Sequence, residues 1–317
     1  MRLAKDSLIY VAGHRGMVGA AVVAALERCG YRNLLVRTHA ELDLAEQGAV
    51  RYFFHQHRPV AVILAAARVG GIKANSTHPA LFIRDNLAIQ GNVIDAAHKS
   101  GVGKLVFLGS SCIYPRLAPQ PIKEEYLLSG PLEPTNEWYA VAKIAGIKQC
   151  QAYRREFGLN AICVMPTNLY GPGDNFDLEN AHVLPALIRR FHEAKLRGDA
   201  RVVAWGTGEP RREFLHVFDL ADAIVQLLER YDDERIINVG CGADSTIREL
   251  CEIVRTVVGY RGGLEFDASK PDGTPRKLLD VSRITAFGWR PKIDLRSGIE
   301  QVYEWYRQNE HLLRLHS

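Results

Sequence analysis

Tyr139 and Lys143 stand four residues apart in a predicted helix over 139–157. Residues at this spacing share one face of a helix, about one turn from each other. A neighbouring ammonium favours the phenolate form, so it lowers the pKa of a tyrosine. The pair is suited to protonating a carbonyl oxygen while a hydride arrives at its carbon. Because Tyr-x3-Lys is common by chance, a cofactor site and another polar group must support this interpretation.

A glycine-rich segment near the N-terminus supplies the first support. It follows the apolar run 7–12 and precedes a helical pattern over 17–28, so it joins a strand to a helix. Glycines at such a turn let a pyrophosphate approach the backbone at the helix N-terminus. The order is G-x2-G-x2-G rather than G-x-G-x2-G, and a plain surface turn is the competing interpretation. The predicted cofactor-binding residues are Gly13, His14, Arg15, Gly16, Met17, Val18 and Gly19.

The end of the next strand, 33–36, bears on the choice of nicotinamide cofactor. An acidic residue there binds the ribose 2′-hydroxyl of NAD, whereas arginine accommodates the 2′-phosphate of NADP. Here the strand ends in Arg37-Thr38-His39, and no carboxylate appears before Glu41. Arg15 and Arg37 thus favour NADP. Asp43 leaves a mixed preference open, and solvated surface charge is the alternative role for the arginines.

A second polar segment, Gly109-Ser110-Ser111-Cys112, follows the apolar run 104–108. Open α/β sheets bind ligands just past the ends of their parallel strands. Ser110 can hydrogen-bond a ketone oxygen beside Tyr139, and a Cys112 thiolate can remove a proton. The competing roles are ordinary turn formation for the serines and a small buried apolar side chain for Cys112.

Alternating strands and helices must position these groups. This alternation, with near-continuously apolar strands such as 60–64, predicts an α/β fold: a doubly wound parallel sheet of the Rossmann type. The predicted strands are 7–12, 33–36, 60–64, 104–108 and 161–165, and the predicted helices between them are 17–28, 46–56, 80–99 and 139–157.

The pattern changes after Pro166, where a loop dense in turn formers runs over 166–175. The sequence predicts a cofactor-binding domain over 1–170 and a smaller substrate-binding lobe over 171–317. A strand near 236–239 is expected to return to the main sheet, so the two parts should interleave. Further predicted elements are helices near 182–197 and 219–230, a strand over 201–205, and a helix over 246–258 that Thr246 and Glu249 cap.

Composition narrows the function classes. The chain has 317 residues, 47% hydrophobic and 24% charged, which is ordinary for a globular protein. A net charge of +4 without a basic block argues against nucleic acid and is compatible with an anionic small substrate. The six cysteines show no metal-ligand spacing, so we expect no metal and free thiols in a reducing cytoplasm. No signal sequence or membrane-spanning run is expected.

Basic residues recur in the second half of the chain. Arginine forks match phosphate oxygens in pairs, so a diphosphate would engage two or more of them. Trp205 offers a flat face for a base, and His182, at a helix start, can donate a proton near neutral pH. Solvated charge, a core tryptophan and a capping histidine are the competing roles. The basic positions are Arg189-Arg190, Arg211-Arg212, Lys270 and Arg276-Lys277.

Five strings of sequence together resemble the extended short-chain dehydrogenase/reductase family. Within it, the chain resembles members that act on a GDP-linked 4-keto-6-deoxy sugar, epimerising C3 and C5 and then reducing C4 with NADPH. The resemblance spans almost the whole chain and implies a homodimer. The strings are 13–19, 69–72, 110–115, 142–148 and 267–277.

The resemblance implies a role for each matching residue. Ser110, Tyr139 and Lys143 would form the reductase triad, and Cys112 and His182 the base and acid of the epimerisations. Family members carry arginine at the position of His39, which leaves Arg15 and Arg37 for the 2′-phosphate and weakens a strict preference for NADPH. The implied substrate contacts are Arg190, Trp205, Arg212 and Asp272, and further cofactor contacts are Arg37, His39, Leu108, Gly109, Ser110, Ser111, Lys143, Pro166, Thr167, Asn168, Leu169 and His182.

Related activities remain alternatives at this point. A reductase of a 3,6-dideoxy sugar would carry the same strings, and a nucleotide-sugar 4-epimerase would not need the Cys112 and His182 pair. Dehydratases of this family resemble one another in a Thr-Asp-Glu string after the fourth strand, and this chain has no carboxylate between Lys104 and Lys123. A non-catalytic NADP-binding sensor would typically lack Tyr139 or Lys143.

Overall fold

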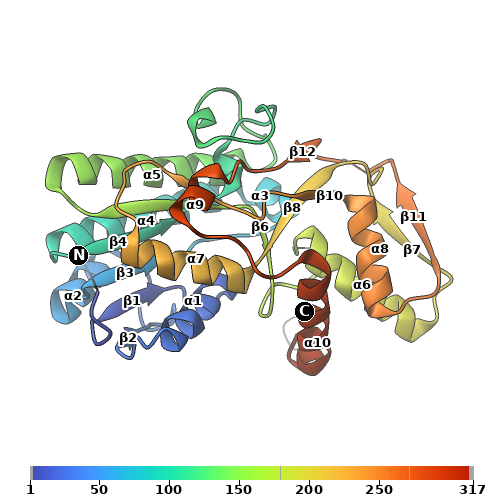
Figure 1. Ribbon diagram of the computed structural model, residues 1–317, viewed down its shortest axis with the longest axis horizontal. Helices are drawn as coiled ribbons and strands as arrows, with labels where there is room; N and C mark the ends of the chain where they lie inside the picture. Colours follow the sequence, from blue (N-terminus) through green and yellow to red (C-terminus); the bar gives the residue numbers. More distant parts are fainter. Residues whose placement is uncertain (1–2, 179, 271, 314–317) are drawn as a thin grey trace.

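A six-stranded parallel sheet forms the centre of the computed structural model, which describes residues 3–178, 180–270 and 272–313 (Figure 1). Its strands lie in the order β2-β1-β3-β4-β5-β9. The fold is thus the predicted doubly wound α/β type. The strands are β1 (Ile9–Ala12), β2 (Leu34–Leu35), β3 (Ala61–Leu64), β4 (Lys104–Leu108), β5 (Ala161–Pro166) and β9 (Ile237–Val239).

Helices cover both faces of this sheet, which explains why its longer strands are almost entirely apolar (Figure 1). One face packs on α2, α4 and α5, and the other on α1, α7 and α9, each through its own apolar core. These helices are α1 (Met17–Arg28), α2 (Gln47–His57), α4 (Pro79–Lys99), α5 (Glu137–Phe157), α7 (Val217–Arg230) and α9 (Ser282–Phe287), while a short α3 (Ile72–Thr77) precedes α4.

The strand order reverses beside β1, because the chain passes from β1 to β2 on one side and then to β3 on the other. Such a reversal opens a crevice at the carboxyl ends of the strands. Gly13 has φ +88°, and a Cβ on it would lie 2.7 Å from the Ala66 nitrogen. A Cβ on Gly19 would lie 2.1 Å from the Gly13 oxygen. Only glycine therefore fits at these two positions.

The second half of the chain builds a smaller lobe around a third apolar core. Its strands form a sheet β10-β8-β12, with β6 paired to β8, and a separate pair β11-β7. Helices α6, α8 and α10 pack on them (Figure 1). The elements are β6 (Asn168–Tyr170), α6 (Val183–Arg197), β7 (Arg201–Trp205), β8 (Arg211–His216), β10 (Asp244–Thr246), α8 (Ile247–Val258), β11 (Gly263–Asp267), β12 (Arg276–Lys277) and α10 (Leu295–Leu313).

Two predictions about this half are confirmed. Strand β9 returns to the main sheet, parallel to β5, so the two parts of the chain interleave. Helix α8 begins with the predicted capping box, in which the Thr246 hydroxyl accepts from the Glu249 N–H and the Glu249 carboxylate accepts from the Thr246 N–H. The exact domain boundary near residue 170 stays a prediction.

One prediction is wrong: residues 168–170 are not a loop but strand β6, parallel to β8. Strand β8 itself was not predicted, because Arg211-Arg212-Glu213 interrupts its apolar pattern. Glu213 is fully buried. Its carboxylate accepts backbone N–H bonds from Gly242 (2.7 Å) and Leu279 (3.0 Å), which satisfies a charge that sequence alone places at the surface.

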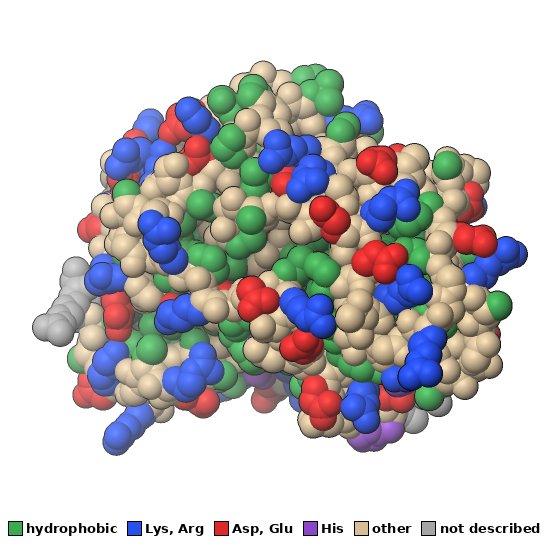
Figure 2. Space-filling model, turned by 45° about the vertical axis from the view of Figure 1, so that its right-hand side comes forward, with side chains coloured by type: hydrophobic (Ala, Val, Ile, Leu, Met, Phe, Trp, Pro, Cys, Tyr) green, Lys and Arg blue, Asp and Glu red, His purple; other side chains and the backbone are tan. Residues whose placement is uncertain are grey.

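On the face shown in Figure 2, basic and acidic side chains are interspersed rather than segregated. No helix within the described ranges is both long enough and apolar enough to cross a bilayer.

Candidate active site

The end of β4 and the first turns of α5 bring three predicted residues together. Ser110 follows β4, and its side chain hydrogen-bonds Tyr139. Tyr139 and Lys143 share a face of α5, and the Lys143 ammonium lies 5.8 Å from the centre of the tyrosine ring. That ammonium is buried and donates to the Leu108 carbonyl at 2.9 Å. The predicted Ser-Tyr-Lys arrangement is therefore assembled.

Burial dominates the acidity of these groups. Desolvation raises the pKa of Tyr139 above its usual value, the charge of Cys112 raises it further, and the Ser110 hydrogen bond opposes both. Desolvation also lowers the pKa of Lys143 to about 8. That Lys143 lowers the tyrosine pKa during reaction stays a prediction.

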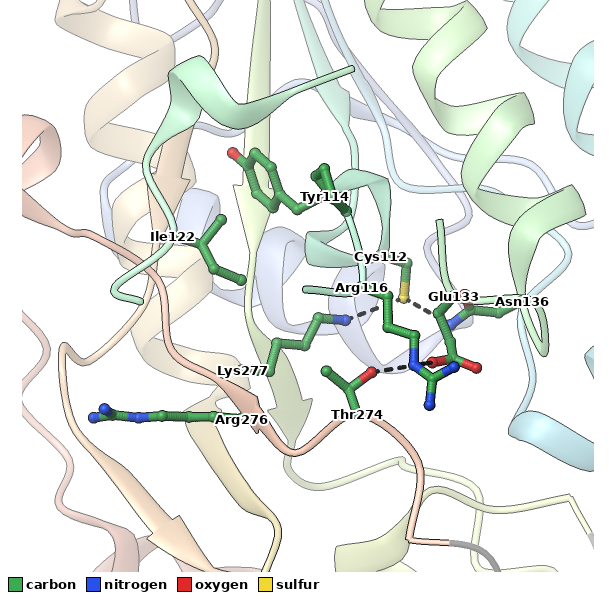
Figure 3. A pocket seen from close by; sticks show the side chains of 10 residues that line it. Cys112, Tyr114, Arg116, Ile122, Glu133, Asn136, Thr274, Arg276 and Lys277 are labelled. Carbon is green, nitrogen blue, oxygen red and sulfur yellow. Dashed lines mark hydrogen bonds and ion pairs between the residues drawn. The ribbon is translucent and has the colours of Figure 1, made fainter. Parts of the chain in front are cut away.

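Cys112 is partly exposed rather than buried among aliphatic side chains. Its Sγ accepts a hydrogen bond from Asn136 Nδ2 at 3.3 Å and another from Lys277 Nζ at 3.5 Å (Figure 3). It lines a cavity of about 30 Å³. The competing role as a small apolar core residue does not fit this polar setting. A sulfur that accepts hydrogen bonds from two donors, one of them an ammonium, is suited to accepting a proton from a bound molecule.

Asn136 and Lys277 were not among the predicted site residues. An asparagine just before a helix normally indicates an N-cap, and Lys277 was predicted only as part of a basic cluster. The same cavity also contains Glu133, which pairs with Arg116 at 3.2 Å and accepts from the Thr274 hydroxyl at 3.3 Å (Figure 3). Glu133 had no sequence signal either.

His182 is the N-cap residue of α6 and is exposed. The loop before it is fixed to the 70–71 turn by a hydrogen bond from the Gly71 N–H to the Asn180 carbonyl (3.1 Å). Partial desolvation lowers the pKa of His182, and the charge of Lys277 lowers it further. Lys277 therefore acts electrostatically on His182 while it hydrogen-bonds Cys112.

We expect Lys277→Met to raise the pKa of His182, because removing a nearby positive charge stabilises the imidazolium. The protonated fraction of His182 at neutral pH should increase. Titration of the His182 ring by NMR, assigned with a His182→Asn variant, measures this. Arg276→Met is the matched control, since Arg276 pairs instead with Asp244. An unchanged or lowered pKa in Lys277→Met would contradict the electrostatic link.

The glycine segment has the features of a cofactor cradle. Gly13 and Gly19 leave no room for side chains at the N-terminus of α1. His14 Nδ1 is buried and has no hydrogen-bond partner among the described residues. A buried polar atom without a partner at a helix N-terminus fits a bound pyrophosphate, to which a ring N–H could donate.

The two predicted phosphate-binding arginines, Arg15 and Arg37, both act electrostatically on one carboxylate, that of Glu41. Glu41 accepts from the Thr38 N–H and hydroxyl, which lowers its pKa, and the charges of Arg37 and Arg15 lower it further. Arg37 itself packs over the Phe53 ring at 5.7 Å. His39 faces Asp43 across 3.7 Å. The ribose end thus offers partners for both a phosphate and a hydroxyl.

The remaining predicted cofactor contacts lie at the carboxyl ends of β4 and β5. A Cβ on Gly109 would lie 2.4 Å from the Met165 sulfur, so a larger residue there would have to displace that side chain. Asn168 Nδ2 donates to the Glu213 carbonyl at 2.7 Å, and the Thr167 hydroxyl donates to the same oxygen at 3.3 Å. Strand β8 thereby holds this segment beside the crevice. The other contacts there are Leu108, Ser110, Ser111, Pro166 and Leu169.

The predicted substrate contacts form two groups. Trp205 is 57% exposed, and its ring lies 5.4 Å from the Arg190 guanidinium and 5.9 Å from the Lys270 ammonium. This is an open aromatic face beside two cations. Arg212 lies deeper: desolvation lowers its pKa, and the charges of Glu133, Asp272 and Cys112 oppose that shift.

Asp272 has a contact that the sequence did not indicate. Its carboxylate accepts from the Thr207 N–H at 2.8 Å and from the Thr207 hydroxyl at 2.9 Å. It therefore fastens the segment before β12 to the turn after β7. Within the described residues, no group of three or more His, Cys, Asp or Glu side chains is arranged to hold a metal ion.

Comparison with known proteins places these features in context. The sequence model of the NAD dependent epimerase/dehydratase family matches residues 9–240. The chain is 62% identical over 305 residues to GDP-L-fucose synthase 1 of Arabidopsis thaliana, covering 96% of this chain and 94% of that protein. It is 53% identical over 315 residues to the GDP-L-fucose synthase of Escherichia coli strain K12, covering 96% and 98%.

A solved structure is also similar. It is a GDP-mannoheptose C4 reductase from Campylobacter jejuni with NADP bound, 41% identical, with a TM-score of 0.90 and coverage of 96% of this chain and 99% of that one.

Proposed function

The chain belongs to the NAD dependent epimerase/dehydratase family, and we propose that it converts GDP-4-dehydro-6-deoxy-D-mannose to GDP-L-fucose with NADPH. The conversion comprises epimerisation at C3 and C5 and then reduction of the C4 ketone. The observation that carries the proposal is the position of the Cys112 sulfur, which accepts two hydrogen bonds and lies two residues beyond Ser110, the serine that hydrogen-bonds Tyr139. Relatives at 62% and 53% identity bear the name GDP-L-fucose synthase.

Epimerisation depends on the C4 ketone, which makes the protons on C3 and C5 acidic because the anion formed is an enolate with charge on O4. Tyr139 and Ser110 hydrogen-bond that oxygen, and donors aimed at developing charge are typically worth about 3 kcal/mol each. Cys112 removes a proton from one face of the sugar, and His182 delivers one to the opposite face. Cys112 then gives its proton to solvent and His182 takes one from solvent, and repetition at the second carbon completes the inversion.

Reduction uses the same oxyanion site. NADPH, when bound, supplies the hydride, and the chain's fit to it is supported by the Gly13–Gly19 cradle and the orphaned His14 nitrogen. Tyr139 gives its proton to O4. Lys143 holds the Leu108 carbonyl and carries positive charge beneath the phenol, which favours that proton transfer.

On the substrate side, Arg190 and Arg212 bind the diphosphate, and the exposed ring of Trp205 stacks on the base. Asp272 contributes by holding its segment against Thr207. Arg15 and Arg37 bind the 2′-phosphate of NADPH. Glu41 and Asp43 can accept a hydrogen bond from the ribose 2′-hydroxyl of NADH, so the protein also uses NADH to some extent. His39 stands at the edge of this site.

One assay tests the proposal: the protein is mixed with NADPH and GDP-4-dehydro-6-deoxy-D-mannose, absorbance is followed, and the product is identified by NMR. GDP-L-fucose with stoichiometric NADPH consumption is expected, and a parallel reaction with NADH should be slower. A C4-reduced product with unchanged C3 and C5 would indicate a plain nucleotide-sugar reductase, as in the heptose enzyme. Turnover without net NADPH consumption would indicate a 4-epimerase, and NADPH binding alone would indicate a sensor.

We also propose that two copies pair through α4 and α5. Three large apolar side chains, Leu87, Trp138 and Val141, are exposed on these helices, and a second copy of the chain would cover them. Light scattering after gel filtration should give about twice the 35.4 kDa chain mass, and Trp138→Glu should lower the measured mass toward that of the monomer.

We further propose a cytoplasmic location, because all six cysteines are free thiols and a reducing compartment keeps thiols free.

A further inference from the structure

Asn136 occupies the N-cap position of α5 but does not cap it. Asparagine is among the preferred N-cap residues because its side-chain oxygen accepts a backbone N–H of the first turn. Here the backbone has φ −139° and ψ 19°, and no side-chain capping bond forms. The amide turns instead to the sulfur of Cys112, to which Nδ2 donates at 3.3 Å. Helix α5 therefore lacks the stabilising N-cap hydrogen bond, and the Asn136 side chain binds Cys112 instead.

The hydrogen bonds at the sulfur have a consistent direction. Asn136 donates through its amide nitrogen, and Lys277, an ammonium that can only donate, approaches at 3.5 Å. Asn136 Oδ1 is buried and has no hydrogen-bond partner among the described residues. The amide orientation that directs Nδ2 at Cys112 therefore leaves the amide oxygen without a hydrogen bond. The two donors thus hold the Cys112 sulfur as a hydrogen-bond acceptor.

The contact also links two parts of the pocket. Asn136 lies three residues before Tyr139, so both side chains project from the first turn of the same helix. Cys112 lies two residues after Ser110, whose hydroxyl accepts from the Cys112 N–H at 3.2 Å. The Asn136–Cys112 contact therefore sets the distance between the sulfur and the Ser110–Tyr139 oxyanion site.

We propose that Asn136 is a positioning residue for epimerisation: its amide holds the Cys112 sulfur as a hydrogen-bond acceptor, directed at the carbon next to the ketone. This rests on the proposed function. Asn136 acts on proton abstraction from C3 and C5 and leaves hydride transfer at C4 unaffected.

Two substitutions test the proposal against one matched control. Asn136→Ala removes the donor, and Asn136→Asp replaces it with a carboxylate of the same shape. Glu137→Gln alters the first turn of α5 at the adjacent position. Three rates are measured: alkylation of Cys112 by iodoacetamide as a function of pH, read peptide by peptide in the protein without cofactor; solvent-deuterium incorporation at C3 and C5; and oxidation of GDP-L-fucose by NADP⁺, which needs hydride transfer but no proton abstraction from carbon.

We expect Asn136→Ala to slow alkylation of Cys112 at pH 7 about ten-fold, the loss typical of one hydrogen bond to a charged group. The alkylation profile should move to higher pH, deuterium incorporation should fall about ten-fold, and GDP-L-fucose oxidation should stay within two-fold. Asn136→Asp should have larger effects in the same directions, because a carboxylate repels a thiolate. Glu137→Gln should leave all three rates within two-fold. The melting temperature of Asn136→Ala should be close to that of the parent, since no capping bond is lost.

Unchanged alkylation and exchange in a folded Asn136→Ala variant would overturn the proposal, as would a parallel fall in all three rates, which would indicate a general structural role. If the parent protein shows neither exchange nor GDP-L-fucose oxidation, the proposed function itself fails. The alkylation profiles need no substrate, so in that case they still decide whether Asn136 controls the sulfur.

Discussion

Replacing Cys112 with serine should slow solvent-deuterium exchange at C3 and C5 of the substrate by at least about 100-fold, because general-base catalysis typically contributes 10²–10⁴-fold. A serine hydroxyl is a far weaker acid than a thiol, so it supplies almost no anion near neutral pH. NADPH affinity should change less than two-fold, since the sulfur faces Asn136 and Lys277 rather than the glycine cradle. Exchange is measured by mass spectrometry in deuterium oxide, and cofactor affinity by fluorescence.

The same variant should change the product. With proton abstraction impaired, C4 reduction proceeds on sugar that keeps its original configuration at C3 and C5. Cys29→Ser, at the exposed C-terminal end of α1, is the matched control and should behave like the parent. Parental exchange in Cys112→Ser would remove this residue from the base role and leave only a reductase.

Replacing Tyr139 with phenylalanine should lower the rate of C4 reduction by about 1,000-fold or more. The change removes the proton donor to O4 and one oxyanion donor, and loss of one such donor alone typically costs about 10²–10³-fold. Exchange at C3 and C5 should also fall, because the enolate loses the same hydrogen bond. The ring should stay in place, since its edge-to-face contact with Phe82, 6.4 Å between centres, does not use the hydroxyl. Single-turnover absorbance of NADPH gives the rate.

Tyr153→Phe is the control for this experiment. It lies on the same helix, and its hydroxyl donates to Asp95 at 3.2 Å, away from the crevice. Parental turnover is expected for Tyr153→Phe. A fully active Tyr139→Phe enzyme would contradict the assignment of the phenol.

In the parent protein, the rate of C4 reduction should also decline as the pH rises through about 8. Burial lowers the pKa of Lys143 to about 8, and the ammonium predominates only below that pH.

Local sequence was sufficient for the parts of the site that lie within one turn or one helix. The glycine segment, the Tyr139–Lys143 spacing and the capping box of α8 each depend on residues a few positions apart. The return of β9 to the main sheet was also predictable, since a short apolar run after a helix in an α/β chain has few other places to pair.

Contacts across the chain were not predictable in this way. Asn136 is 24 positions from Cys112 and Lys277 is 165, and neither distance leaves a local pattern. Asn136 also resembles an ordinary helix cap, so its real partner was hidden by a common role. That Arg15 and Arg37 hold the 2′-phosphate stays a prediction. The contact between Glu41 and Thr38 was not predicted, because it depends on side-chain hydrogen bonds within the turn that follows the strand.

The buried Glu213 has a consequence for how the enzyme works. Its carboxylate ties Leu279, two residues beyond Lys277, to strand β8, while its carbonyl ties Thr167 and Asn168 at the end of the main sheet. One residue, through its side chain and its backbone carbonyl, thus joins the two walls of the crevice. We expect the binding site to be rigid before the sugar binds and not to close by a hinge motion. Heating should therefore unfold the pocket and the rest of the protein in a single transition.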